Sequence, residues 1–170
     1  MAFCFLLPYS EGVFYRLYQP VDFPPLYAIE EACFQPPLRF SRRYMRQLVA
    51  SERSATWVAE DDGQLVGFAI VEWSGPPAEI AAYIQTIEVS PDHRRRGVGL
   101  QLLRHIEDSA RSAGASQIWL HVDMENDAAI RLYRAEGYAQ RATHAHYYGR
   151  TRDAAIYCKQ FTVDRGATES

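Results

Sequence analysis

The sequence predicts an α/β protein: a central mixed sheet, mostly antiparallel with one parallel pair of strands, and helices on both faces. A strand, a helix and a second strand follow one another over residues 80–122, which implies a parallel pair with a right-handed crossover. Strands joined by short turns precede and follow this unit, and such neighbours pair antiparallel. The chain has 170 residues, 48% of them hydrophobic and 23% charged, as expected of one globular domain.

The first half of the chain is expected to hold a strand, two helices and three further strands. Alternating polarity indicates the first strand, and Asp22 followed by prolines is a helix start signal. Ser41 can cap the second helix, and Asp61-Asp62-Gly63 is typical of a β-hairpin turn. The expected elements are a strand at 13–18, helices at 22–33 and 41–50, and strands at 55–59, 65–73 and 80–89.

The second half is expected to hold two helices and three strands. Apolar residues four apart, from Val98 to Ala110, indicate an amphipathic helix, and Gly114 is a good C-terminal stop. Asn126 can cap a shorter helix that ends at Gly137. The expected elements are a helix from 97 to about 113, a strand at 117–122, a helix at 126–136, and strands near 138–148 and 154–163.

We interpret residues 1–170 as a single domain with its core at about 12–163, and we expect the segments 1–11 and 164–170 to be peripheral. A formal net charge of −3 and a pI of about 5.9 argue against general nucleic-acid binding. No apolar stretch is long enough to span a bilayer, and the N-terminus lacks the charged region and cleavage site of a signal peptide. We therefore expect no nucleic-acid partner and no membrane.

Neither a disulfide framework nor a metal site is expected. Cys4, Cys33 and Cys158 are far apart and lack the spacing of a zinc site. Free thiols in a reducing cytosol are the simplest interpretation, which predicts a cytoplasmic protein. His144 and His146 alternate along an expected strand, but they have no third ligand at suitable spacing.

The most informative segment is a basic loop with two glycines at 94–99, which lies between an expected buried strand and an amphipathic helix. A helix N-terminus leaves backbone N–H groups free and carries partial positive charge, and Gly97 and Gly99 let an anion approach the main chain. With three arginines beside them, these features predict a pyrophosphate site. A Walker A loop would need Gly-Lys-Ser/Thr, and a dinucleotide fingerprint would need a small residue at Leu102, so both are excluded.

The loop resembles the acetyl-CoA loop of the GNAT superfamily of N-acetyltransferases, Gln/Arg-x-x-Gly-x-Gly/Ala. A second segment, which runs from Asn126 to Tyr133 and on to Gly137-Tyr138, resembles the second signature of that family, and the order of elements is that of the family fold. The resemblance covers about residues 12–163. It implies that acetyl-CoA lies in a V between the two parallel strands, which splay apart, and that the amine attacks the thioester directly. The residues that it assigns to the cofactor are Ile87, Glu88, Val89, Arg94, Arg95, Arg96, Gly97, Val98, Gly99, Asn126 and Tyr133.

The resemblance also assigns the groups that move protons. Tyr133 stands where the family has the tyrosine that protonates the leaving thiolate, although a tyrosine that only packs the helix on the sheet is the alternative. Tyr83 and His121 resemble a water-mediated base pair of some protein N-terminal acetyltransferases, whereas the bacterial ribosomal-protein alanine acetyltransferases have a Glu in place of His121. The alternative is that His121 is hydrogen-bonded to backbone groups and has no catalytic role. Glu88, which faces away from its two neighbours in the strand, is either a rival base or a structural carboxylate.

The acceptor side resembles the same N-terminal acetyltransferases. The residues expected to bind the acceptor are Phe34, Pro36, Pro37, Phe40, Tyr147 and Tyr148, and ordinary loop and hairpin packing is the alternative. The preferred acceptor is the N-terminal α-amine of a protein, with a small-molecule amine as the alternative. A non-catalytic acyl-CoA-binding regulatory module is the rival from another class. Acetyl-CoA is expected as co-substrate without a metal, in a monomer or a homodimer.

Overall fold

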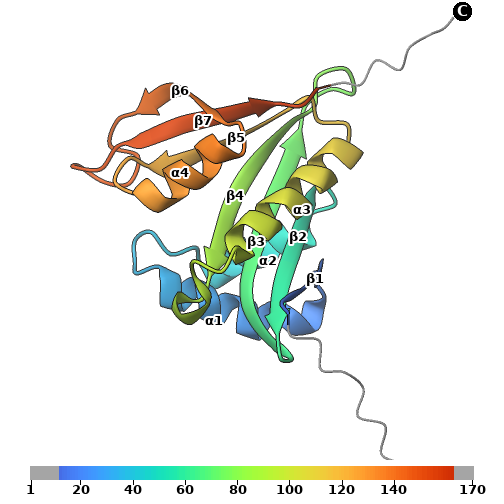
Figure 1. The fold of residues 1–170 in the computed structure, drawn as a ribbon. Helices are drawn as coiled ribbons and strands as arrows, with labels where there is room; N and C mark the ends of the chain where they lie inside the picture. The colour runs from blue at the N-terminus through green and yellow to red at the C-terminus, as the bar shows by residue number, and fades with distance from the viewer. Residues whose placement is uncertain (1–11, 163–170) are drawn as a thin grey trace, which may run out of the picture.

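The computed structural model describes residues 12–162, so Cys4 and the expected peripheral segments lie outside the described residues. The order of helices and strands is the one expected from the sequence, with two short 3-10 turns added at Pro20–Asp22 and Pro91–His93. The elements are β1 (Phe14–Leu17), α1 (Phe23–Cys33), α2 (Arg42–Ala50), β2 (Ser54–Asp61), β3 (Gln64–Ser74), β4 (Ala81–Val89), α3 (Val98–Ser112), β5 (Gln117–Asp123), α4 (Asp127–Ala135), β6 (Ala139–His144) and β7 (Ala154–Gln160) (Figure 1).

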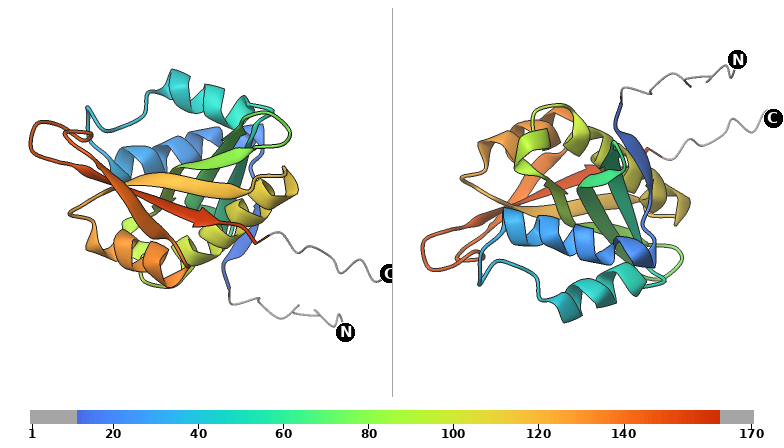
Figure 2. Two further views of the ribbon diagram at one scale, coloured as in Figure 1. Left: turned by 90° about the horizontal axis from the view of Figure 1, so that it is seen from above. Right: turned by 90° about the horizontal axis from the view of Figure 1, so that it is seen from below.

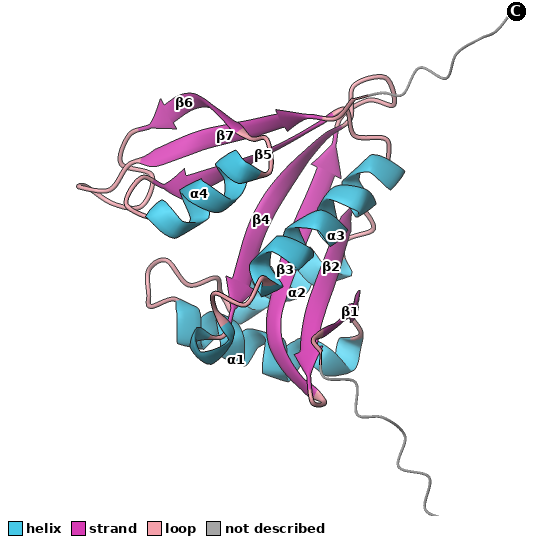
Figure 3. Cartoon of the chain, viewed as in Figure 1, coloured by secondary structure: helices cyan, strands magenta, loops and turns pink. Residues whose placement is uncertain are grey.

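The seven strands of the described part form one sheet in the order β1-β2-β3-β4-β5-β7-β6. Its one parallel pair is β4 and β5, and the other neighbours are antiparallel, which confirms the expected mixed sheet. The parallel pair is short: Ala81–Tyr83 lies opposite Gln117–Trp119, and beyond these residues the strands diverge. Figures 1 and 3 show the V that results between β4 and the group formed by β5, β6 and β7.

Helices cover both faces of the sheet, as the two views of Figure 2 show. α1 and α2 pack on one face around Phe23, Leu26 and Phe68. α3 and α4 pack on the other face, where Leu102 and Ile106 lie in the larger cluster of buried residues. None of the helices in residues 12–162 is long and apolar enough to cross a membrane.

An irregularity in β4 decides which side chains face the V. The pairing of β4 with β3 shifts by one residue at Gln85, and such a bulge turns two consecutive side chains towards nearly the same face. The hydroxyl of Tyr44, on α2, lies 3.5 Å from Gln85 Oε1, and the next residue, Thr86, donates to Glu88. β4 therefore presents polar side chains towards α1 and α2, whereas Ile87 packs with the cluster under α3.

The local signals in the sequence have the expected structural roles. The Ser41 hydroxyl and the Asn126 carbonyl each accept a hydrogen bond from the backbone N–H three residues later, at 3.2 and 3.1 Å, which confirms both helix caps. In the turn between β2 and β3, Asp62 and Gly63 have φ of 49° and 77°, the left-handed conformation that a tight hairpin requires.

One local expectation is confirmed and one needs correction. α1 begins directly after Asp22, as expected, although the Asp22 carboxylate accepts hydrogen bonds from Arg16, at 2.7 and 2.9 Å, and none from the helix. The strand expected near 138–148 ends at His144, because the chain turns there and has a φ of 57° at His146. His144 and His146 therefore do not share a strand face, and Tyr147-Tyr148 lies in the loop between β6 and β7.

Candidate active site

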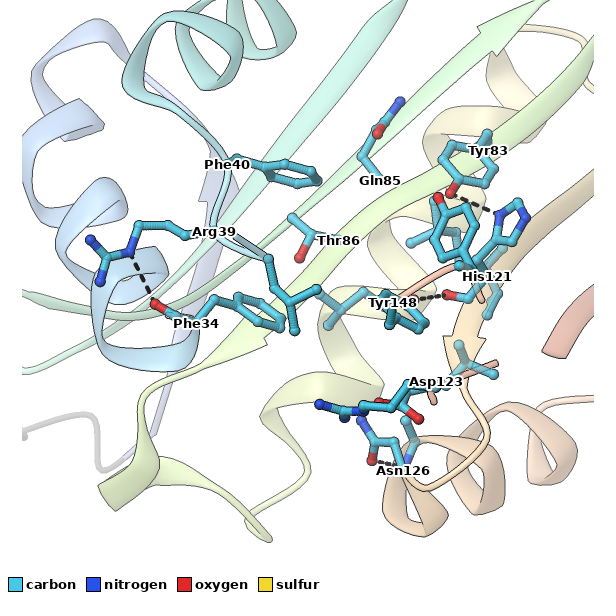
Figure 4. Close-up of a pocket in the computed structure, with 18 of the residues that line it drawn as sticks. Phe34, Arg39, Phe40, Tyr83, Gln85, Thr86, His121, Asp123, Asn126 and Tyr148 are labelled. Carbon is cyan, nitrogen blue, oxygen red and sulfur yellow. Dashed lines mark hydrogen bonds and ion pairs between the residues drawn. The ribbon is translucent and has the colours of Figure 1, made fainter. Parts of the chain in front are cut away.

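A cavity with a volume of about 1010 Å³ opens in the V between β4 and β5. Its walls come from β4, β5, the end of α1, the α1–α2 loop, the start of α2, α4 with the residues before it, and the β6–β7 loop. Figure 4 shows Phe34 and Phe40 on one side of the cavity and His121 and Tyr148 on the other. The residues predicted from the sequence that line it are Phe34, Pro37, Phe40, Tyr83, Ile87, His121, Asn126, Tyr133, Tyr147 and Tyr148.

The other predicted site residues lie outside this wall. Pro36 is in the α1–α2 loop but does not line the cavity, and Glu88 and Val89 occupy the end of β4 beyond it. The basic loop at 94–99 follows β4 and leads into α3. A Cβ atom built on Gly99 would lie 3.8 Å from Val89 and 4.0 Å from a side chain of α4, so the loop sits between β4 and α4 at the end of the V.

The loop at 94–99 forms a concave group of main-chain donors. Within residues 12–162, the N–H groups of residues 95–100 have no hydrogen-bond acceptor. Arg95 and Gly97 have φ of 62° and 79°, and left-handed residues in such a loop can turn neighbouring N–H groups to one side. The space around the Cα of Gly97 is open, with nothing within 4 Å of a Cβ built there. These free donors at a helix N-terminus fit a pyrophosphate.

Arg94 has a different role from its two neighbours. Its Nε donates to the carbonyl oxygen of Val89 at 3.0 Å, and its Nη2 lies 3.4 Å from the Cys33 sulfur. The resemblance assigns this carbonyl to the pantetheine arm, but in this structure Arg94 engages it. Arg95 and Arg96 are exposed, which leaves their charges available to phosphate oxygens.

Tyr133 lies on α4 at the cavity wall, with 8% of its surface exposed. Its ring packs edge-on against Tyr138, with centroids 5.5 Å apart, and in the described part of the chain its hydroxyl has no hydrogen-bond partner. Burial, and to a smaller extent Tyr148, raises the pKa of Tyr133 well above its ordinary value. The phenol therefore holds its proton at neutral pH and can donate it to an anion that forms in the cavity.

Tyr83 and His121 meet near the vertex of the V. Tyr83 is the last residue of β4 that pairs with β5, opposite Trp119, and His121 lies two residues further along β5. The Tyr83 hydroxyl lies 3.1 Å from His121 Nδ1. Burial lowers the pKa of His121 below its ordinary 6.5, and His144 lowers it further, so the imidazole is neutral at neutral pH and can accept a proton. Burial, and to a smaller extent the neighbouring Tyr147, raises the pKa of Tyr83, which therefore stays a phenol.

The β6–β7 loop holds His121 from two sides. The Tyr147 ring stacks on the imidazole, with centroids 4.2 Å apart and an angle of 4° between the planes. The Tyr148 hydroxyl donates to the carbonyl oxygen of His121 at 3.3 Å, and burial raises the pKa of Tyr148 to about 12. Tyr147 is 42% exposed, so its ring also forms part of the mouth of the cavity.

Glu88 faces α1, and 3% of its surface is exposed. Its Oε1 accepts a hydrogen bond from Thr86 at 2.7 Å, and burial together with a hydrogen bond to Glu30 raises the pKa of Glu88 to about 9. Glu30 lines the cavity and accepts a hydrogen bond from the N–H of Phe40 at 2.6 Å. A carboxyl group that holds its proton at neutral pH is a poor base, so the geometry favours a structural role for Glu88, in which it ties β4 to the α1–α2 loop.

Several contributors to the site were missed by the sequence analysis. Gln85 and Thr86 line the cavity because of the bulge in β4, which left no recognisable signal in the sequence. Glu30 had one signal, a carboxylate among the apolar positions of an amphipathic helix, which indicates a buried partner. His144, considered above only as a metal ligand, contacts His121. Among the described residues, no group of three or more His, Cys, Asp or Glu side chains is placed to hold a metal ion.

Comparisons with known proteins agree with this geometry. Residues 23–138 match the model of the acetyltransferase (GNAT) family. The chain is 30% identical over 140 residues to the [Ribosomal protein bS18]-alanine N-acetyltransferase of Escherichia coli K12, an alignment that covers 81% of this chain and 90% of that protein. It is 45% identical over 87 residues to the streptothricin acetyltransferase of Streptomyces lavendulae, which covers 51% of this chain and 45% of that relative.

Solved structures show the same fold. The ribosomal-protein-S18-alanine N-acetyltransferase from Escherichia coli superposes with a TM-score of 0.77 at 26% identity, covering 91% of this chain and 98% of that one. Arabidopsis thaliana Naa50, solved in complex with the bisubstrate analogue CoA-Ac-MVNAL, superposes with a TM-score of 0.76 at 25% identity. The superposition covers 88% of this chain and 99% of that one.

Proposed function

As a member of the acetyltransferase (GNAT) family, this chain is an acetyl-CoA-dependent N-acetyltransferase, and we propose that its acceptor is the N-terminal α-amine of a protein. The observation that carries the proposal is the acceptor side of the cavity. Phe34 and Phe40 form one wall, Tyr147-Tyr148 lies opposite, and the Tyr83–His121 pair lies at the vertex. The terminal residues of an extended peptide fit between such aromatic walls with the amine directed towards His121. The relative that aligns over 90% of its length is named for the alanine of a ribosomal protein.

The cofactor lies along the V in this proposal. The main-chain N–H groups of residues 95–99 hold the pyrophosphate, and Arg95 and Arg96 add charge. The backbone of β4 at Ile87 holds the pantetheine arm, and the Val89 carbonyl oxygen joins it only where Arg94 releases that oxygen. Asn126 lies at the start of α4 on the opposite side. Acetyl-CoA supplies the thioester carbonyl that the amine attacks. The free N–H groups and the adjoining cavity support this placement.

Proton movements then follow from the side chains. The α-ammonium gives up one proton through Tyr83 to His121 and attacks the thioester as a free amine. A C–N bond forms and the C–S bond breaks, and Tyr133 donates its proton to the departing thiolate. The nitrogen loses a second proton as the C–S bond breaks, and this proton restores the Tyr133 hydroxyl. For each ammonium acetylated, one proton therefore reaches solvent and one leaves on the thiol. An α-amine has a pKa of about 8, compared with about 10.4 for a lysine side chain, so the weak base His121 suits the former.

A small-molecule amine is the second candidate acceptor. The 45% identity to a streptothricin acetyltransferase over about half of the chain favours it. The same cofactor loop serves either acceptor, because the loop offers main-chain groups and makes no contact with the acceptor. Cytoplasmic location, a monomer or homodimer, a single domain over 1–170, and the absence of nucleic-acid and membrane partners stay predictions.

A thiol-release assay with acetyl-CoA tests the acceptor. The panel contains peptides with a free α-amine, the same peptides blocked at the N-terminus but carrying lysine, and small amines that include streptothricin. We expect acetylation of the free α-amines and little reaction of the blocked peptides. Turnover of small amines with no reaction of any peptide would replace the protein acceptor by the small-molecule one. Absence of thiol release with every amine, in a protein that binds acetyl-CoA, would support the non-catalytic rival.

His121→Ala tests the base in the same assay. We expect a lower kcat/KM at neutral pH that partly recovers as the pH rises, because free amine then accumulates without help from the enzyme. A variant as active as the wild-type protein at neutral pH would remove His121 from the mechanism.

A further inference from the structure

We propose that His144, on β6, is the outer member of a proton relay that carries the proton of the acceptor amine from His121 to solvent. The inference rests on the proposed role of His121 as the base. It adds a residue that does not line the cavity.

Three side chains from three strands form a continuous row. The Tyr83 hydroxyl lies 3.1 Å from His121 Nδ1, and His121 Nε2 lies 3.3 Å from His144 Nδ1. The row begins at the cavity wall, which both Tyr83 and His121 line, and ends at His144, which is exposed. It therefore connects the site of proton release to bulk water through side chains alone.

One arrangement of hydrogen atoms satisfies the whole row. The Tyr83 O–H donates to His121 Nδ1, so neutral His121 carries its hydrogen on Nε2 and donates to His144 Nδ1. Neutral His144 then carries its hydrogen on Nε2. Every hydrogen bond in the row thus runs outward, which is the direction that a proton from the amine must take.

The transfer balances at each atom. The Tyr83 oxygen accepts a proton from the ammonium as its own proton moves to His121 Nδ1. The Nε2 proton of His121 moves to His144 Nδ1, and the Nε2 proton of His144 moves to water. Each group gains one proton and gives up one, so neither Tyr83 nor His121 is left with a charge.

The surroundings of His121 make such an exit useful. Among the described residues, the rings in contact with the imidazole belong to Tyr83, Trp119, His144 and Tyr147, and none of them carries a negative charge at neutral pH. Burial and His144 both lower the pKa of His121, so a proton that stayed there would be held weakly. At the exposed His144, water solvates the charge.

The test compares His144→Asn with His146→Asn. In the first variant, Oδ1 of the introduced amide can take the place of Nδ1 as the acceptor, but an amide cannot pass a proton on. His146 is exposed two residues further along and has a φ of 57°, which asparagine tolerates, so the same substitution there is a matched control. Turnover of whichever amine the wild-type protein acetylates is measured near neutral pH in weak buffer, with and without added imidazole. His121→Ala is measured in parallel.

We expect His144→Asn to lower kcat by about 10-fold in weak buffer, a part of the range that general acid–base catalysis contributes. Added imidazole should restore most of the loss by accepting the proton from His121 directly, while His146→Asn behaves like the wild-type protein. The acid limb of the kcat profile should move to higher pH in His144→Asn, because the electrostatic effect by which His144 lowers the pKa of His121 is gone.

Three results overturn the relay. If His144→Asn matches the wild-type protein in weak buffer while His121→Ala is slow, His144 carries no proton. If His144→Asn is slow and imidazole does not restore it, His144 only positions His121. If His121→Ala is itself as fast as the wild-type protein, the proposed base fails and the relay fails with it.

Discussion

The cofactor loop and the acceptor side of the cavity are built from different parts of the chain. The loop at 94–99 is contiguous and presents main-chain N–H groups, which the left-handed conformations of Arg95 and Gly97 turn to one side. The acceptor side consists of side chains that come from β4, β5 and two loops, and its outer members, Phe34 and Tyr148, are far apart in sequence.

The difference between a main-chain site and a side-chain site explains how one fold can serve several acceptors. A main-chain site depends on backbone conformation, so it is retained while side chains elsewhere change. A side-chain site on loops can be altered without loss of the fold. We therefore expect substitutions in the loop to affect cofactor binding with every acceptor, and substitutions on the acceptor side to depend on which amine is offered.

The largest effect is expected for Gly97→Val. A β-branched residue disfavours the φ of 79° at this position, so the N–H groups should no longer converge. At about 100 times its Kd a ligand stabilises a protein by about 2.7 kcal/mol, and we expect the corresponding rise in Tm with acetyl-CoA to disappear.

Gly63→Val is the matched control, because Gly63 has a φ of 77° and an equally open environment in the β2–β3 turn. It should lower the Tm of the free protein but keep the rise with acetyl-CoA. A normal rise in Gly97→Val would show that the main chain of the loop is not the pyrophosphate site.

The next largest effect is expected for Tyr133→Phe. Tyr133 lies between the cofactor loop and the acceptor side of the cavity. Loss of the phenolic proton should lower kcat by about 10²-fold, while acetyl-CoA still raises the Tm. Tyr138→Phe is the control, because its hydroxyl donates to Glu107 at 2.8 Å. It should cost about 1 kcal/mol of stability and leave kcat nearly intact. Near wild-type turnover of Tyr133→Phe, with chemistry limiting the rate, would leave Tyr133 as a packing residue.

A smaller effect is expected for Tyr147→Ala. Removal of the ring at the mouth of the cavity should raise the KM for peptides by about 10-fold with less change in kcat, because positioning contributes to ground and transition states alike. Phe14→Ala removes an exposed aromatic ring from β1, at the opposite edge of the sheet, and serves as the control. An unchanged peptide KM would show that the Tyr147 ring only covers His121.

The smallest effect is expected for Glu88→Gln, and it concerns stability. A glutamate in the unfolded chain titrates near pH 4.3, whereas Glu88 in the folded protein keeps its proton up to about pH 9. Between these values the unfolded state binds fewer protons, so the free energy of unfolding falls as the pH rises. Glutamine removes this dependence, so between pH 5 and pH 6 the variant should gain on the order of 1 kcal/mol over the wild-type protein.

Denaturant unfolding at several pH values measures this gain, with the exposed Glu52→Gln as control. A stability difference that does not vary with pH would mean that Glu88 is ionised in the folded protein. Turnover of Glu88→Gln compares the two candidate bases, Glu88 and His121. We expect Glu88→Gln to lose less turnover than His121→Ala. An equal or larger loss of turnover would assign the base to Glu88.

The elements of the fold could be predicted because their signals are local. Ser41 and Asn126 cap helices within one turn, and Asp62-Gly63 forms its hairpin from adjacent residues. The loop at 94–99 could be predicted for the same reason, since its donors are consecutive. The acceptor side depends on register, which the sequence does not show. The bulge at Gln85 redirects part of β4, and the early end of β6 separates His144 from the loop that follows.

Beyond Tyr83, β4 has no strand beside it on the side of β5 in the described part of the chain. It is therefore a sheet edge in the middle of a seven-stranded sheet. Unpaired N–H and C=O groups along an edge can pair with a second polypeptide and start aggregation, and proteins commonly cover such edges. A pantetheine arm laid along this strand would cover it. Bound acetyl-CoA would then shield this edge from a second polypeptide as well as supply the acyl group.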